Sequence, residues 1–186
     1  MLQIGQTIED GTYQAFHNGE IRPITLSDYR GKWMVLIFYP GDFTFVCPTE
    51  LGEAAELYPE FQKLDSEVFG VSTDSAYVHK AWHDSSPTIK AVTFPMLADP
   101  SGKLCREFGT YLEEGVSLRG SFIVDPDGVL RTAEIHDNRI GRSGKELLRK
   151  LQAAIHVREV PGEVCPAEWR PGQQTLKPGL DLIGKI

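Results

Sequence analysis

The sequence predicts an α/β fold in which a mixed β-sheet has helices on both faces. Residues 32–40 form a short, almost unbroken apolar run, which is typical of a strand buried on both sides. Apolar residues recur at spacings of three and four in the segment that follows, as in an amphipathic helix. Farther along, two strand-like segments flank a tight-turn sequence. Strands joined first by helices and later by a hairpin form a sheet with both parallel and antiparallel pairs.

The first half of the chain alternates strands with helices. The strand at 32–40 (KWMVLIFYP) leads, after Pro48, into the amphipathic helix. Residues 67–73 (EVFGVST) are rich in β-branched and aromatic residues and form the next strand. A second helix spans 75–84 and is capped by Ser75 or by the aspartate before it, since either side chain can accept from a free N–H group.

The second half contains a short helix, a hairpin and a closing helix. The short helix covers residues 103–111. Strands at 121–125 and 129–136 flank Pro-Asp-Gly, which supplies the fixed φ and the positive φ that a tight turn requires. Residues 142–156 place their leucines on one face of a helix. Thioredoxin-like folds have this arrangement, and we expect one here.

The chain is long enough for one domain and an appended arm. Its 186 residues fall within the usual length of a single domain, which we expect to cover residues 1–156. Residues 157–186 contain four Pro and four Gly, too many for a continuous helix or strand. This C-terminal arm also carries Trp169 and several aliphatic residues, so we expect it to dock rather than to extend freely into solvent.

Charge and hydropathy exclude several classes of partner. With 26 acidic and 19 basic residues the formal net charge is −7, and no run of Lys or Arg exceeds two residues. Nucleic-acid binding is therefore not expected, because it requires a concentrated basic face. No apolar run reaches the ~18–20 residues that span a bilayer, so no membrane partner is expected. The first five residues do not lead into a secretory signal, and a reducing cytoplasm is the expected compartment.

The three cysteines do not form a disulfide framework or a zinc pair. Cys47, Cys105 and Cys165 are odd in number and show no Cys-x-x-Cys spacing. Cys47 lies just past the buried strand and opens the helix, where free N–H groups and the helix dipole favour an anion such as a thiolate. Because a residue before proline avoids the α region, Cys47 is either the helix cap or the first residue of the turn.

The residues around Cys47 resemble the active-site motif of the peroxiredoxins. Pro40, Thr44 and Cys47-Pro48 have the spacing of that motif, and the flanking FYPGDFTFVCPTE is similar to the typical two-cysteine class. Around Cys165, the segment GEVCPAEW resembles the resolving-cysteine segment of the same class. The ending LIGKI is similar to the bacterial alkyl hydroperoxide reductase C branch of the family. The resemblance covers nearly the whole chain.

This resemblance implies a thiol peroxidase for hydrogen peroxide and organic hydroperoxides. Cys47 would attack the O–O bond as the thiolate, leaving a sulfenic acid and releasing water or an alcohol. Cys165 of a second subunit would then condense with the sulfenic acid to form an intersubunit disulfide. Thr44 would bond sulfur and peroxide, Arg119 would polarise both, and Pro40 would shield the site.

The resemblance also implies supporting residues and partners. Glu50 is expected to orient the arginine, and Trp82 is expected to line the pocket. Homodimers are expected to assemble as a decamer of five dimers. Electrons would arrive from a flavoprotein disulfide reductase or from thioredoxin. The Gly-Gly-Leu-Gly insertion and the Tyr-Phe helix of oxidation-sensitive relatives are absent, so we expect Cys165 to react quickly and over-oxidation to be slow.

The remaining candidate residues have simpler interpretations. The glycine near Arg139 and Arg142 does not form a phosphate loop, and no Gly-x-Gly-x-x-Gly follows a strand, so no nucleotide or other cofactor is expected. His79 and His83 have the i, i+4 spacing of metal ligands, but a third ligand is missing, and we interpret them as ordinary helix residues. Cys105 is interpreted as structural. A redox-dependent holdase chaperone and a peroxide sensor or relay are the alternative functions.

Overall fold

The structure is a computed structural model that describes residues 1–185. The described chain divides into two compact units, Met1–Gly144 and a second unit that begins at Lys145, and each is considered by itself. No helix among the described residues is both long enough and apolar enough to span a bilayer.

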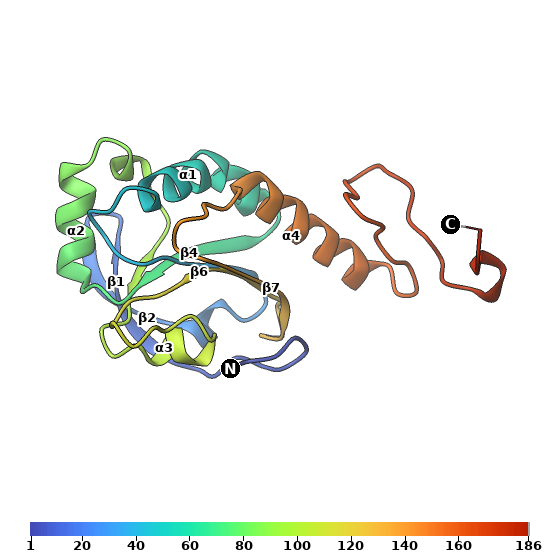
Figure 1. The fold of residues 1–186 in the computed structure, drawn as a ribbon, viewed down its shortest axis with the longest axis horizontal. Coiled ribbons are helices and arrows are strands. Elements are labelled where there is room, and N and C mark those ends of the chain that lie inside the picture. The colour runs from blue at the N-terminus through green and yellow to red at the C-terminus, as the bar shows by residue number, and fades with distance from the viewer. Residues whose placement is uncertain (186) are drawn as a thin grey trace. The chain divides into compact units, whose positions relative to one another are not determined.

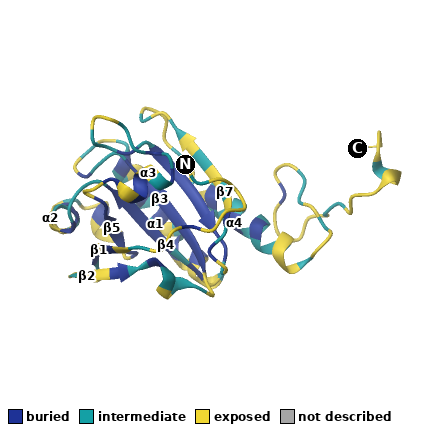
Figure 2. Ribbon diagram, turned by 90° about the horizontal axis from the view of Figure 1, so that it is seen from below, coloured by how far each residue is buried: buried dark blue, intermediate teal, exposed yellow. Residues whose placement is uncertain are grey.

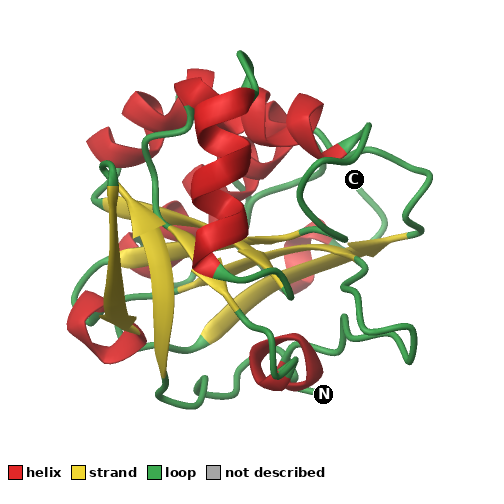
Figure 3. Ribbon diagram, turned by 90° about the vertical axis from the view of Figure 1, so that its left-hand side faces the viewer, coloured by secondary structure: helices red, strands yellow, loops and turns green. Residues whose placement is uncertain are grey.

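The first unit is built on a seven-stranded sheet with the strand order β2-β1-β5-β4-β3-β6-β7. The strands are β1 (Thr12–His17), β2 (Glu20–Thr25), β3 (Trp33–Phe38), β4 (Ser66–Ser72), β5 (Met96–Ala98), β6 (Arg119–Val124) and β7 (Leu130–His136). The central pairs β3–β4 and β4–β5 are parallel, and the remaining pairs are antiparallel. The sheet is therefore mixed, as expected, and Figure 3 shows its twist.

Helices cover both faces of this sheet, which confirms the predicted fold class. The helices of the chain are α1 (Cys47–Lys63), α2 (Ala76–Ser85), α3 (Lys103–Glu107) and α4 (Gly144–Glu159). Single 3₁₀ turns occur at Leu26–Tyr29, Ile89–Ala91 and Leu180–Leu182. Figure 1 shows α1 and α3 on opposite faces of the sheet. Ser75, one of the two expected caps, is the N-cap of α2 and accepts from the Val78 N–H group.

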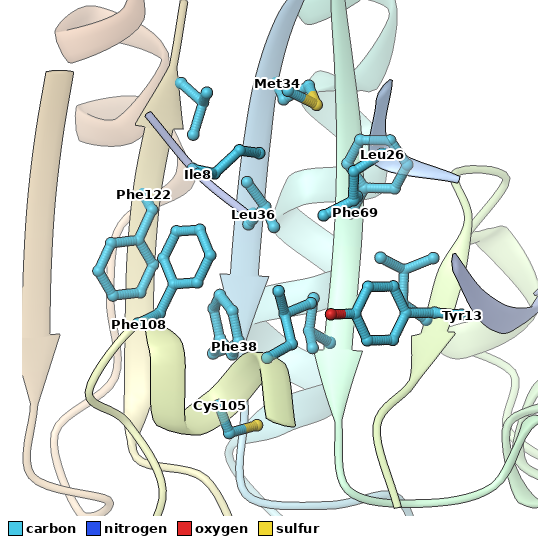
Figure 4. Close-up of a cluster of buried hydrophobic side chains, with 14 of the residues drawn as sticks. Ile8, Tyr13, Leu26, Met34, Leu36, Phe38, Phe69, Cys105, Phe108 and Phe122 are labelled. Carbon is cyan, nitrogen blue, oxygen red and sulfur yellow. The ribbon is translucent and has the colours of Figure 1, made fainter. Parts of the chain in front are cut away.

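The hydrophobic core lies on both sides of β3, all six residues of which are buried. Alternate side chains of this strand, including Leu36 and Phe38, pack with Phe122 and with Phe108 just after α3 (Figure 4). On the face of α1, Leu51, Ala54 and Phe61 of that helix are buried. Figure 2 shows this burial as dark central strands surrounded by exposed loops. Burial of β3 on both faces explains its continuous apolar sequence.

Three strands of the structure were not predicted, and two helices end or begin at other residues than expected. The hairpin of β1 and β2, closed by Asn18 and Gly19 with positive φ, was not predicted, nor was the three-residue β5. The short helix α3 ends at Glu107 rather than at residue 111, because Gly109 follows in the left-handed region. The closing helix α4 begins two residues later than predicted and continues to Glu159.

The second unit consists of α4 from Lys145 onward and an irregular segment. Trp169 is buried, and its carbonyl oxygen accepts from Arg149, so part of the arm is docked as expected. An isolated antiparallel bridge joins Val164 to Leu176. Leu180 and Ile183, in contrast, are largely exposed. The last residue of the expected apolar ending, Ile186, lies outside the described residues.

Candidate active site

Cys47 is the first residue of α1, and its side chain is fully buried. Val46 is the N-cap, so the alternative in which Cys47 itself caps the helix is excluded. Pro48 occupies the first turn, where its missing N–H group costs no intrahelical hydrogen bond. The residue that carries the sulfur therefore lies at the N-terminus of a 17-residue helix, the positive end of the helix dipole.

Arg119 brings a positive charge to this sulfur. It is the first residue of β6, and β6 lies beside β3, the strand that leads toward Cys47. Its Nη1 donates to Cys47 Sγ at 3.4 Å and to Glu50 Oε2 at 2.6 Å. Its Nε donates to the Asn138 carbonyl oxygen at 2.9 Å, which fixes the plane of the guanidinium. The side chain is only 4% exposed, so solvent screens these interactions little.

Glu50 binds a second arginine that the sequence analysis did not identify. Arg142 donates to Glu50 Oε1 through its backbone N–H group (2.8 Å) and through Nε (2.9 Å), and to Oε2 through Nη2 (3.0 Å). Burial alone raises the pKa of the Glu50 carboxyl, but the hydrogen bonds and charge of Arg142 and the charge of Arg119 outweigh it and leave that pKa below its usual range. One carboxylate and two guanidinium groups sum to +1, so a thiolate at Cys47 neutralises the cluster.

The loop between β3 and α1 carries the other residues of the motif. Pro40 is half-buried, and Thr44 Oγ1 donates to the Gly41 carbonyl oxygen at 2.8 Å. The Thr44 hydrogen is thus directed to the loop backbone in this structure. Trp82 of α2 is buried, and its ring lies 6.2 Å from that of Phe43. Trp82 therefore packs against the loop.

Cys165, the expected resolving cysteine, lies in the second unit as a free thiol. It is half-buried, and its sulfur is 3.9 Å from the Ala153 carbonyl oxygen of α4. Burial raises the pKa of the Cys165 thiol, while the nearby Arg149 charge acts in the opposite direction. The neutral thiol is therefore the favoured form of Cys165 while the arm is docked.

Comparisons with known proteins identify the family. A sequence profile of the AhpC/TSA family matches residues 4–133, and one of the C-terminal domain of 1-Cys peroxiredoxin matches residues 154–183. Over the full length of both chains, this chain is 50% identical to alkyl hydroperoxide reductase C of Escherichia coli (strain K12) and 48% identical to that of Pseudomonas aeruginosa (strain UCBPP-PA14). This chain belongs to the AhpC/TSA family.

Solved structures agree with this assignment. Enterococcus faecalis AhpC is 48% identical, with a TM-score of 0.86, and the match covers 89% of this chain and all of the other. The reduced 2-Cys peroxiredoxin of Plasmodium vivax is 30% identical, with a TM-score of 0.89, and the match covers 96% of this chain and 94% of the other. The predicted membership of the peroxiredoxins is confirmed, and with it the thioredoxin-like fold.

Three residues singled out by the sequence, Cys105, His79 and His83, lie apart from this site. Cys105 is buried in the core, and burial together with the Asp99 charge raises the pKa of its thiol to about 12. His79 is completely buried and contacts Asp42, whereas His83 is partly exposed. Within residues 1–185, no group of three or more His, Cys, Asp and Glu side chains is arranged to hold a metal ion.

Proposed function

We propose that this peroxiredoxin reduces hydrogen peroxide and organic hydroperoxides to water and alcohols, with Cys47 as the reacting thiol. The observation that carries the proposal is the Arg119 guanidinium 3.4 Å from a sulfur at the start of a helix. That arrangement stabilises a thiolate and also supplies a donor for an oxygen that gains negative charge.

The reaction transfers two electrons from sulfur to the peroxide. The Cys47 thiolate attacks one peroxide oxygen, so that an S–O bond forms and the O–O bond breaks. The departing oxygen takes up a proton and leaves as water or an alcohol, and Cys47 becomes a sulfenic acid. Because the Thr44 hydrogen points to Gly41, Thr44 Oγ1 can accept the hydrogen bond of the peroxide O–H group.

Most of the acceleration is expected from hydrogen-bond donors and alignment. Each donor aimed at the developing charge contributes about 10²–10³-fold in enzymes that use such groups. Glu50 and Arg142 hold the Arg119 guanidinium in place, which reduces the reorganisation required during the reaction. Pro40 is assigned to the exclusion of water from the loop side.

We assign the second step to Cys165, which lies in the C-terminal arm, residues 157–186. Its thiol on a partner subunit would attack the Cys47 sulfenic acid, so that a disulfide forms and water leaves. The hydrogen bond from the Cys165 thiol to the Ala153 carbonyl oxygen must break first, because it holds Cys165 against α4 of its own subunit. A separate dithiol reductant, either a flavoprotein disulfide reductase or thioredoxin, would then restore both thiols.

Self-association and a cytoplasmic location complete the proposal. We expect homodimers that assemble as a decamer. Phe45 is 93% exposed, and Phe43 and Tyr77 are also exposed, which supports a buried contact between copies because large exposed aromatic groups favour association. The strand β7 lies at the edge of the sheet, where a strand of a second copy could be added.

Stopped-flow peroxide consumption tests the activity. The wild-type chain should react rapidly with one equivalent of hydrogen peroxide, and Cys47→Ser should lose this reaction. Cys105→Ser is the matched control, because Cys105 lies in the core and should leave the rate unchanged. Equal peroxide consumption by the wild type and Cys47→Ser would contradict the proposed function.

A further inference from the structure

Asp42 and His79 form a hydrogen-bonded pair whose side chains are both 0% exposed. The distance from His79 Nδ1 to Asp42 Oδ2 is 2.7 Å, and His79 Nε2 lies 3.2 Å from the Leu97 carbonyl oxygen. A carbonyl oxygen only accepts, so Nε2 must donate to it. Nδ1 and the Asp42 side chain are joined by the second hydrogen bond of the ring. The Tyr39 hydroxyl donates to the remaining carboxylate oxygen at 2.8 Å.

The backbone of Asp42 is fixed as firmly as its side chain. Its N–H group donates to Asp74 Oδ2 at 2.8 Å, and the same oxygen accepts from Ser72 Oγ at 2.8 Å. The partners of Asp42 thus come from the ends of β3 and β4 and from α2, and α2 is tied through His79 to β5. Asp42 is the point at which these four elements hold the loop between β3 and α1.

The residue after Asp42 has a backbone conformation that requires such support. Phe43 has a φ of +56°, in the left-handed region that a bulky residue rarely adopts. Its side chain is 56% exposed, so burial gives little compensation. Strained conformations of this kind persist where neighbouring groups impose them, and they cluster at functional sites. In this loop the fixed neighbour of Phe43 is Asp42. Thr44 follows Phe43 in the chain, so its position depends on the same turn.

We infer that His79, acting through Asp42, is a positioning residue for peroxide. The pair holds the loop that carries Pro40 and Thr44, whereas the thiol environment depends on other elements. Cys47 and Glu50 lie on α1, and Arg119 lies on β6. Loss of His79 should therefore misplace the groups that align the peroxide and leave the reactivity of the sulfur itself intact. The inference rests on the proposed peroxidase function.

Two reactions of the same sulfur separate these effects. Oxidation by peroxide requires the aligned loop, whereas alkylation by iodoacetamide requires only an accessible thiolate. In His79→Leu, the rate constant for peroxide should fall by about 10–100-fold, since misplacement of about 1 Å can cost 10²-fold. The rate of Cys47 alkylation should stay within about twofold. His79→Gln keeps one donor for Asp42 and should recover part of the peroxide rate.

An internal reporter and a matched variant provide the controls. Cys105 lies in the core, where burial and the Asp99 charge raise the pKa of its thiol to about 12, whereas the Cys47 sulfur faces Arg119. Cys105 is therefore expected to react only when the chain unfolds, and its labelling measures any unfolded fraction in the same reaction. His83→Leu changes the same residue type one turn later, at a position outside the pair, and should preserve both rates. If His79→Leu does not fold, the same comparison of the peroxide rate with the alkylation rate is made in His79→Gln.

Three outcomes would overturn the inference. Peroxide and alkylation rates that fall together, or a lower peroxide rate matched by new labelling of Cys105, would show that His79 only stabilises the fold. An unchanged peroxide rate in a folded His79 variant would also refute it. In each case the proposed function stands as long as Cys47→Ser remains inactive in the same assay.

Discussion

The Arg119 Nη1 atom lies 3.4 Å from the Cys47 sulfur. Arg119 is the first residue of the strand β6, and Cys47 is the first residue of the helix α1. The same nitrogen donates to Glu50 Oε2. The guanidinium is thus held by a carboxylate while it faces the sulfur. A fixed donor needs little reorganisation when charge develops on an oxygen beside it.

Replacement of Arg119 should mainly slow the peroxide step. Arg119→Lys keeps the charge but loses the planar guanidinium, whose Nη1 donates to the sulfur and to Glu50 while its Nε donates to the Asn138 carbonyl oxygen. We therefore expect a rate constant about 100-fold lower. Competition with a second peroxidase for limiting peroxide measures this rate. Arg139→Lys is the control, because that side chain is 89% exposed and pairs only with Asp137 among the described residues. A loss of less than about threefold for Arg119→Lys would contradict its assigned role.

Glu50→Gln should destabilise the chain in a pH-dependent way. The folded pKa of Glu50 lies below its usual value, so its stabilisation is complete above the unfolded pKa of ~4.3 and is lost as pH falls through the folded pKa. Removing the charge leaves two buried guanidinium groups without a carboxylate, at a cost of about 3–5 kcal/mol near pH 7.

Urea unfolding at several pH values measures this difference. The difference in the free energy of unfolding between wild type and Glu50→Gln should be largest at neutral pH and should become smaller below about pH 4. Glu60→Gln changes an exposed glutamate of the same helix, paired with Lys63, and should differ little from the wild type. A gap that does not vary with pH would show that Glu50 is not ionised in the folded chain.

Cys105 should be inert in the folded chain. Burial and the Asp99 charge raise the pKa of its thiol to about 12, so the reactive thiolate is scarce at neutral pH. Iodoacetamide treatment followed by peptide mass spectrometry should find Cys105 unmodified in the native chain and modified in urea. Native labelling of Cys105 at the rate of Cys47 would refute its structural assignment.

Over-oxidation of Cys47 should be slow. Residues 160–185 contain one isolated bridge and one 3₁₀ turn, so the arm around Cys165 has few backbone hydrogen bonds to break before it opens. After a small excess of peroxide, intact mass measurement should show mostly disulfide. Cys165→Ser, which lacks the resolving thiol, should accumulate sulfinic acid instead. Mostly sulfinic acid in the wild type would contradict this expectation.

The fold could be predicted where the sequence of a single strand or helix shows a clear apolar pattern. The strand β3 is buried on both faces, and its six residues are all apolar or aromatic, so its sequence shows its environment directly. The hairpin of β1 and β2 has an Asn18-Gly19 turn, which is a hairpin signal, but polar residues and Pro23 interrupt the strand pattern. The three residues of β5 are too few to show any period.

The site was predictable only as far as the family motif reaches. Cys47, Thr44 and Arg119 were identified through that resemblance, and the structure brings Arg119 to Cys47. Arg142 binds Glu50 across 92 positions of the chain, and nothing in its local sequence shows this. His79 likewise contacts Asp42 across 37 positions, whereas its sequence context, with the spacing of a metal ligand but no third ligand, led to its interpretation as an ordinary helix residue. Such pairs depend on the tertiary fold.

Peroxide should oxidise Cys47 and no other thiol of this chain. The decisive experiment traps the sulfenic acid with dimedone in Cys165→Ser after one equivalent of hydrogen peroxide. Because the resolving thiol is absent, we expect one adduct per chain, located at Cys47 by peptide mass spectrometry, with Cys105 unlabelled. An adduct at Cys105, or consumption of peroxide with no adduct at Cys47, would refute the assignment of Cys47 as the reacting thiol.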